Sequence, residues 1–160
     1  MTKSLVAYFS RTGEQYSVGD ITKGNTEIIA EMIAKRTGAD TFEIKVVNDN
    51  YPDKYNSLIQ FAKQEKQANK RPEIEGKVEK FDEYDTIFIG YPNWWAEMPM
   101  PVYTFLESYD FSNKKLYHFC THEGSGGVKH DGFAIYGHVA QNERPKAEEK
   151  VAEWLENIGY

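Results

Sequence analysis

Short apolar runs alternate with amphipathic segments along this chain, and this alternation restricts the possible folds more than any other feature of the sequence. Apolar runs bounded by turn residues are typical of buried strands, whereas apolar residues three and four positions apart indicate helices. The expected strands cover residues 5–9, 41–47, 86–89, 115–120 and 133–139, and the expected helices cover residues 26–36, 55–69, 101–108 and 145–158. Strands that alternate with helices form βαβ units, so we expect a doubly wound α/β fold with helices on both faces of a parallel sheet.

The length and charge of the chain narrow its class. A chain of 160 residues has the size of one domain, so we expect residues 1–160 to form a single domain. The net charge of -6 argues against nucleic acid as a partner, because a phosphate backbone requires a basic face. The apolar run near the N-terminus is too short for a signal peptide or a membrane span, and we expect a cytoplasmic protein without a membrane partner. Cys120 is the only cysteine, which excludes an intrachain disulfide.

Polar and glycine-containing segments follow three of the expected strands. They cover residues 10–26, 91–95 and 121–127, and they carry hydroxyls, amides, glycines and large aromatic side chains. In a parallel sheet of this kind, ligands bind outside the carboxyl ends of the strands. We therefore expect the three segments to form a small-molecule site together at one edge of the sheet.

The first segment contains GDITKGNT, residues 19–26, which matches a Walker A phosphate loop except that Asn25 replaces its lysine. The Walker A lysine reaches the β- and γ-phosphates, which a monophosphate lacks. The sequence therefore argues against ATP or GTP and favours a ligand with one terminal phosphate. The hydroxyls of Ser10 and Thr12 and the first amides of the following helix would bind that phosphate. An ordinary helix N-cap at Asn25 is the alternative interpretation.

The second and third segments favour a flat ligand. Trp94 and Trp95 directly follow a buried strand, and Tyr91 adds a third ring. Two adjacent indoles suit an aromatic ligand, although one of them can instead pack into the core below the next helix. The third segment is rich in glycine, which lets backbone amides approach a ligand edge, and a flexible surface loop is its alternative interpretation.

Taken together, these motifs resemble those of flavodoxin-like FMN-binding proteins, in particular the bacterial subgroup with longer loops. The matching stretches are residues 7–13 (AYFSRTG), 24–26 (GNT), 89–96 (IGYPNWWA) and 119–126 (FCTHEGSG). The resemblance covers nearly the whole chain. It implies a three-layer, five-stranded parallel sheet of order 2-1-3-4-5, which is the strand order known from flavodoxin itself.

The resemblance also implies roles for individual residues, and FMN is the cofactor. The phosphate loop would consist of Ser10, Arg11, Thr12, Gly13, Asn25 and Thr26. The isoalloxazine ring would be flanked by Tyr91, Pro92, Asn93, Trp94 and Trp95. The pyrimidine edge and the ribityl chain would be lined by Thr121, His122, Glu123, Gly124, Ser125 and Gly126. We assign no catalytic residue and expect no metal site.

Two features depart from the pattern of that family. An insertion of residues 14–23 interrupts the phosphate loop and would cover the site or contact a partner. Only residues 126–132 remain between the fourth and fifth strands, so we expect the helix at this position to be missing or reduced. The sheet would then be thinly covered there, and an exposed apolar surface would favour a homodimer.

The expected function is redox chemistry with bound FMN. The acidic composition and small size favour a flavodoxin-type electron carrier that docks transiently with redox partner proteins. One alternative is a reductase that takes hydride from NAD(P)H and reduces a quinone or a similar small molecule. A further alternative is a module without redox activity that binds another phosphorylated ligand through the first segment.

Overall fold

The chain folds around a five-stranded parallel sheet, seen in a computed structural model that describes residues 3–15, 18–95, 97–124 and 132–160. The strands are β1 (Ser4–Tyr8), β4 (Asp40–Glu43), β5 (Thr86–Pro92), β6 (Lys115–His122) and β7 (Phe133–Tyr136). Their spatial order is β4-β1-β5-β6-β7, and all four pairings are parallel. The expected order 2-1-3-4-5 is therefore confirmed.

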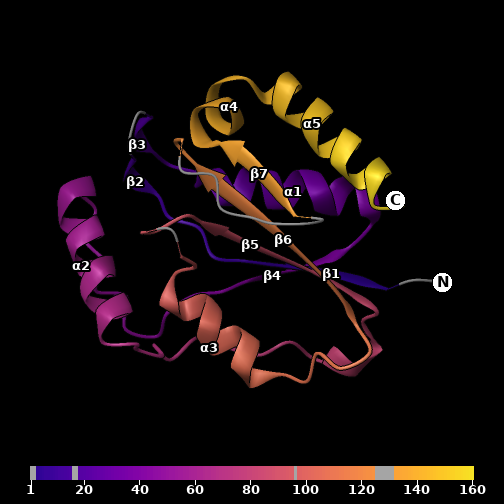
Figure 1. Ribbon diagram of the computed structural model, residues 1–160, viewed down its shortest axis with the longest axis horizontal. Coiled ribbons are helices and arrows are strands. Elements are labelled where there is room, and N and C mark those ends of the chain that lie inside the picture. The colour runs from indigo at the N-terminus through magenta and orange to yellow at the C-terminus, as the bar shows by residue number, and fades with distance from the viewer. Residues whose placement is uncertain (1–2, 16–17, 96, 125–131) are drawn as a thin grey trace.

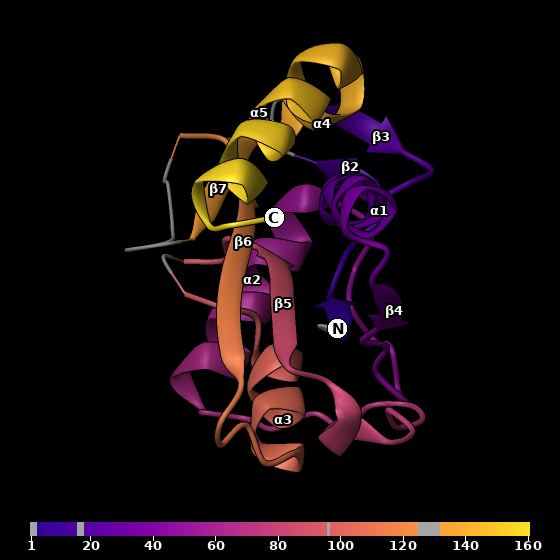
Figure 2. The ribbon, with the colours of Figure 1, turned by 90° about the vertical axis from the view of Figure 1, so that its right-hand side faces the viewer.

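Helices cover both faces of this sheet, which makes three layers (Figure 1 and Figure 2). One face carries α1 (Asn25–Thr37), α4 (Gly137–Asn142) and α5 (Arg144–Asn157), and the other carries α2 (Tyr55–Gln67) and α3 (Met100–Ser108). Successive strand residues point to opposite faces, so Val6 and Phe88 join the first core while Leu5 and Ile87 join the second. Burial on both faces explains why β1 and β5 are continuous apolar runs.

Three elements differ from the expectations. The second expected strand is shorter. β4 ends at Glu43, the Ile44 amide still donates to the Tyr8 carbonyl of β1, and Val46 then forms an isolated antiparallel bridge to Ile74. The last expected strand ends at Tyr136, and α4 starts at once. The His138 amide, in the first turn of α4, donates to the Glu123 carboxylate. This contact helps to start the helix, and the periodicity of the sequence does not reveal it.

The insertion in the first segment forms a small hairpin. Its strands are β2 (Gly13–Gln15) and β3 (Gly19–Ile21), which pair antiparallel. The backbone amide of Glu14 donates to the Asp53 carbonyl, and the Glu14 carboxylate accepts the amide of Tyr55 at the start of α2. These two hydrogen bonds attach the insertion to the start of α2.

The connection between β6 and β7 spans residues 123–132, of which 125–131 lie outside the described residues. On β7, Ala134 and Tyr136 are exposed while Phe133 and Ile135 are buried. A homodimer through this face stays a prediction, which light scattering at high micromolar concentration tests. Within the described residues, no helix combines the length and the apolar character that crossing a membrane requires.

Candidate functional site

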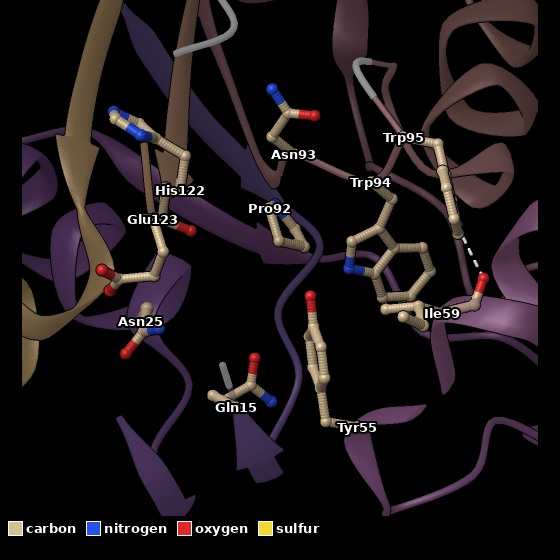
Figure 3. Close-up of a pocket in the computed structure, with 11 residues that line it drawn as sticks. Gln15, Asn25, Tyr55, Ile59, Pro92, Asn93, Trp94, Trp95, His122 and Glu123 are labelled. Atoms are coloured by element: carbon tan, nitrogen blue, oxygen red, sulfur yellow. Dashed lines mark hydrogen bonds between the residues drawn. The ribbon is translucent and has the colours of Figure 1, made fainter. Parts of the chain in front are cut away.

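A cavity of about 320 Å³ opens at the carboxyl ends of β5 and β6, within the usual size range of small-molecule sites. Its lining comprises Gln15, Asn25, Tyr55, Ile59, Pro92, Asn93, Trp94, Trp95, Thr121, His122 and Glu123. Figure 3 shows the two tryptophans and Tyr55 on one side and Asn25, His122 and Glu123 on the other. We call this space the aromatic cavity. The side with the two tryptophans and Tyr55, which we call the aromatic wall, suits a flat apolar ring. The side with Asn25, His122 and Glu123, which we call the polar wall, offers polar groups.

Trp94 joins the aromatic wall to the protein core. Its ring packs edge-on against Phe9 with centroids 5.4 Å apart and lies 5.5 Å from the ring of Tyr51. Its side chain is half-buried and still lines the cavity. Both interpretations of this tryptophan therefore apply, since one part of the ring packs in the core and another part faces the cavity.

Trp95 is held differently, by contacts with α2. Its indole Nε1 donates to the Ile59 carbonyl at 2.6 Å, and Lys66 Nζ donates to the Trp95 carbonyl at 2.7 Å. The side chain is 41% exposed, and its backbone φ of +56° lies in the left-handed region. Such a backbone costs about 1–3 kcal/mol for a bulky residue and persists only where surrounding contacts fix it. The contacts with α2 supply that restraint.

The N-terminus of α1 lies beside the polar wall. Ser10 Oγ accepts the Glu27 amide at 3.0 Å and so caps the helix from a distant part of the chain. A Cβ on Gly24 would lie 2.0 Å from Ser10 Oγ and 2.8 Å from the Arg11 carbonyl oxygen, so the turn is too tight for any side chain there. The amides of Asn25 and Thr26 have no partner within the helix, because the first turn lacks preceding carbonyls.

Asn25 carries the clearest sign that this wall binds a ligand. Its side-chain Oδ1 is buried and has no hydrogen-bond partner among the described residues. Buried polar atoms are nearly always paired, so an unpaired acceptor in a cavity wall indicates a donor on a ligand. Gly137 makes room for this side chain, since a Cβ there would lie 2.4 Å from Asn25 Nδ2.

Thr26 and Thr121 join α1 to the end of β6. Their hydroxyls share a hydrogen bond of 2.8 Å, and both residues are buried. The Thr26 hydroxyl is therefore engaged within the protein, and its backbone amide is the group available to a phosphate.

Among the described residues of the lining, Glu123 is the only carboxylate. Its Oε1 accepts the His138 amide and its Oε2 pairs with His138 Nδ1, both at 2.7 Å. The pair fixes the third segment to α4.

His122 lies next to this pair and offers a hydrogen-bond donor. Burial lowers the pKa of its imidazole despite the nearby Glu123, so the ring is neutral at pH 7. Its Nδ1 accepts the Gly124 amide at 2.9 Å, which assigns the proton to Nε2. His122 can therefore donate from Nε2.

A second cavity, of about 400 Å³, lies on the other side of the first segment. Its lining includes Ser10, Arg11, Thr12 and Lys45 together with the carboxylates of Glu27, Glu43, Asp49 and Glu75, so carboxylates outnumber cationic side chains there. Burial, with help from Glu43 and Glu31, raises the pKa of Glu27. We call this space the acidic cavity. Its carboxylates disfavour a phosphate, so the helix end at Asn25 is the better anion site.

Arg11 is directed toward the acidic cavity. Its guanidinium pairs with Asp49 at 2.7 Å, donates to the Tyr51 carbonyl and lies 5.2 Å from the centroid of the Tyr51 ring. Tyr51 in turn contacts Trp94, and its hydroxyl donates to the buried Glu65. Arg11 thus fixes the loop behind the aromatic wall.

The structure brings eight of the expected site residues into the lining of the aromatic cavity: Asn25, Pro92, Asn93, Trp94, Trp95, Thr121, His122 and Glu123. Ser10, Arg11 and Thr12 line the acidic cavity instead. Gly13, Thr26 and Gly124 line neither cavity, and the buried Tyr91 packs against His118. Ser125 and Gly126 lie outside the described residues.

Sequence reasoning missed Gln15, Tyr55, Ile59 and His138. Nothing local marks them, because their position depends on how the insertion and α2 pack. Cys120 is 1% exposed, and burial raises the pKa of its thiol to about 12, so it stays protonated.

Comparison with known proteins identifies the family. The model of the flavodoxin family matches residues 3–158. The chain belongs to the flavodoxin family. This confirms the family indicated by the motifs and, with it, FMN as the cofactor. No protein among curated sequences matches this chain.

Solved structures agree in fold. A candidate flavoprotein from Bacteroides eggerthii has a TM-score of 0.76 at 25% identity, covering 100% of this chain and 99% of its own. One from Bacteroides uniformis has a TM-score of 0.72 at 25% identity, covering 94% and 98%. A flavoprotein from Lactobacillus acidophilus, solved with FMN, has a TM-score of 0.64 at 23% identity, covering 89% and 98%.

The residues present fit FMN. The aromatic wall suits the ring system, and the amides and the unpaired Asn25 Oδ1 suit its polar edge or its ribityl hydroxyls. The end of α1 suits a phosphate monoester without a lysine.

Proposed function

We propose that this protein is an electron carrier that binds FMN noncovalently in the aromatic cavity and exchanges electrons with protein partners. The observation that carries the proposal is the cavity itself, which places two tryptophans opposite polar groups and beside a helix N-terminus. FMN supplies the redox chemistry when bound, and the protein binds, orients and shields it.

The phosphate is bound by the first turn of α1. The Asn25 and Thr26 amides donate to it, and the Ser10 hydroxyl keeps a hydrogen to donate while its oxygen accepts the Glu27 amide. Hydrogen bonds to a charged acceptor contribute about 1.5–3 kcal/mol each, against about 0.3–1 kcal/mol from the helix dipole. The direct donors therefore dominate, and the missing lysine is not required.

The ring is bound between the two walls. Trp94 is held by the core, whereas Trp95 is held by α2, so both indoles are oriented before the ligand arrives. On the polar side, His122 Nε2–H and the Asn25 side chain offer a donor and an acceptor to the edge of the ring system. Such preorganisation reduces the entropy lost on binding.

The first test is the visible spectrum of the purified protein, followed by an FMN titration that monitors flavin fluorescence. We expect flavin bands, or quenching to a sharp endpoint at one FMN per chain. Absence of both bands and quenching would exclude the proposal and leave the helix end at Asn25 as an ordinary cap.

A second experiment separates a carrier from an NAD(P)H-dependent reductase of quinones or similar acceptors. The FMN-loaded protein is mixed with NADH or NADPH in a stopped-flow instrument. We expect slow bleaching of the flavin band in the absence of a partner protein. Rapid bleaching would show that the protein is an enzyme.

A further inference from the structure

The exposed side of α2 is basic, unlike the chain as a whole. Residues 54–72 hold five of the chain's 19 basic side chains and only one of its 25 acidic side chains, Glu65. Glu65 is 9% exposed and accepts a hydrogen bond from the Tyr51 hydroxyl. This segment therefore presents only positive charge to solvent, although the net charge of the chain is -6.

Two of these basic residues contact Trp95, an exposed residue at the cavity, one at its ring and one at its backbone. Lys63 Nζ lies 5.2 Å from the centroid of the Trp95 ring, and Lys66 Nζ donates to the Trp95 carbonyl. Trp95 is among the most exposed large apolar side chains of the described residues, at 41%. An exposed tryptophan is a typical centre of a protein–protein contact, and the charges around it favour a partner of opposite charge.

Among the described residues, the positive charge on this side is only partly offset, by the electrostatic interaction of Lys70 with the buried Glu65. Arg71 pairs with Glu107, but no described carboxylate lies within salt-bridge distance of Lys63, Lys66 or Lys70. An anion from another molecule can therefore approach all three lysines. We call Lys63, Lys66, Lys70 and Trp95 the α2 face.

The α2 face lies directly beside the cofactor site. Tyr55 and Ile59 of the same helix line the aromatic cavity, and Trp95 belongs to both the lining and the α2 face. Figure 1 shows α2 at the outer side of the molecule, far from α5 on the opposite face of the sheet. A partner bound there would lie against the aromatic wall of the cavity. Its own cofactor could then approach the bound FMN closely, as electron transfer requires.

We propose that the α2 face docks the acidic surface of a redox partner protein. The inference rests on the proposed electron-carrier function. The net negative charge of the chain would favour a basic partner at long range, but charges farther apart than about 8 Å are largely screened at physiological ionic strength. At contact distance the local lysines therefore dominate, and they select a partner with carboxylates around its own cofactor.

The test uses the FMN-loaded protein, reduced chemically, and two oxidised haem proteins of opposite surface charge. One acceptor is an acidic b-type cytochrome and the other a basic c-type cytochrome. Stopped-flow absorbance gives the second-order rate constant with each at ionic strengths from low to above physiological. The variant is Lys63→Glu/Lys70→Glu, which keeps the Lys66 contact with Trp95. The control is Lys35→Glu/Lys150→Glu, the same charge change at exposed sites on α1 and α5.

At physiological ionic strength we expect the α2 variant to lower the rate with the acidic acceptor about ten-fold and to raise it with the basic acceptor. The control should change both rates by much less. Equal effects of both variants would show that net charge steers the encounter, and an unchanged rate in the α2 variant would show that docking occurs elsewhere. Either result overturns the proposal.

Failure of the electron-carrier function has its own signature, since neither acceptor would then oxidise the reduced protein. Docking is in that case measured by NMR titration of the FMN-loaded protein with the acidic cytochrome. Shifts of α2 amides and of the Trp95 indole signal that disappear in the α2 variant would support the acidic partner. Absence of such shifts would exclude it.

Discussion

The aromatic cavity and the acidic cavity open at the same edge of the sheet and are similar in size, about 320 and 400 Å³, yet their linings differ in kind. Among the described lining residues, the first has two tryptophans, three side-chain amides and one carboxylate, while the second has four carboxylates and the two cations Arg11 and Lys45. A parallel sheet offers ligand space wherever its strands end, so position alone does not choose between the two. The lining side chains determine which cavity binds the ligand. A phosphate and an aromatic ring both favour the first lining, whereas the carboxylates of the second repel a phosphate.

Tyr51 and Trp94 lie between the two cavities, and we call this pair of rings the partition. Tyr51 contacts Arg11 of the acidic cavity and Trp94 of the aromatic cavity, and its hydroxyl is bound by Glu65. The following predictions remove this partition, or change one cavity at a time.

The largest expected effect comes from Trp94→Ala, which removes the aromatic half of the partition. Loss of the packing against Phe9 and Tyr51 should lower the free energy of unfolding by about 3 kcal/mol, measured by urea denaturation of the FMN-free protein. Trp95→Ala is the matched comparison. It should change that stability by less than about 1 kcal/mol and weaken FMN binding about ten-fold, since it removes one stacking surface. Equal losses of stability would show that both indoles belong to the core.

The next effect concerns the turn between the cavities. In Gly24→Ala the new Cβ would meet Ser10 Oγ and the Arg11 carbonyl, so the turn before α1 must shift. Loss of one or two phosphate hydrogen bonds should weaken FMN binding about 100-fold, measured by fluorescence titration. Gly38→Ala is the control: its φ of +72° makes alanine unfavourable there, but no atom lies near the new Cβ and the site is at the far end of α1. It should lower stability and leave the dissociation constant unchanged.

A smaller effect is expected from the buried carboxyl behind the partition. Burial raises the pKa of Glu65 above its ordinary value, although the Tyr51 hydrogen bond and Lys70 act in the opposite direction. A raised pKa in the folded state means that the contribution of Glu65 to stability is complete below its unfolded pKa of about 4.3 and declines as pH rises through its folded pKa. Glu65→Gln should therefore show a weaker decline of the melting temperature from pH 4 to pH 8. If the melting temperature of both proteins falls equally between pH 4 and pH 8, Glu65 does not cause the decline and the prediction is wrong.

The smallest effect tests the charge of the acidic cavity. Glu27 lies in the first turn of α1, near the amides that bind phosphate, so Glu27→Gln should tighten FMN binding about three-fold by removing a repulsive charge. Glu31→Gln, one turn farther along the helix and paired with Lys23, should change the affinity less. The comparison is made by titration at low salt, and the gain should shrink at high salt. Weaker binding in Glu27→Gln would place the phosphate away from this helix end.

The fold was largely predictable because its signals are local. Each strand that is buried on both faces needs a continuous apolar run, as in residues 5–9 and 86–89, and each helix shows its own period. Gly38 takes the left-handed conformation that ends α1, as its position in the sequence indicates. The errors fall where a distant contact decides, at the early end of β4 and at the start of α4 at Gly137. The hairpin in the insertion has no local signal and was not predicted.

The sequence by itself determined which segments end at the carboxyl edge of the sheet and which chemistry they carry there. The tertiary structure decided which way each side chain points. Arg11 pairs with Asp49, 38 residues away, and the Thr26 hydroxyl with Thr121, 95 residues away. The orientation of Trp95 likewise depends on α2. Periodicity records the environment of one segment, whereas these contacts depend on the packing of several segments at once, so only the folded chain separates the aromatic cavity from the acidic one.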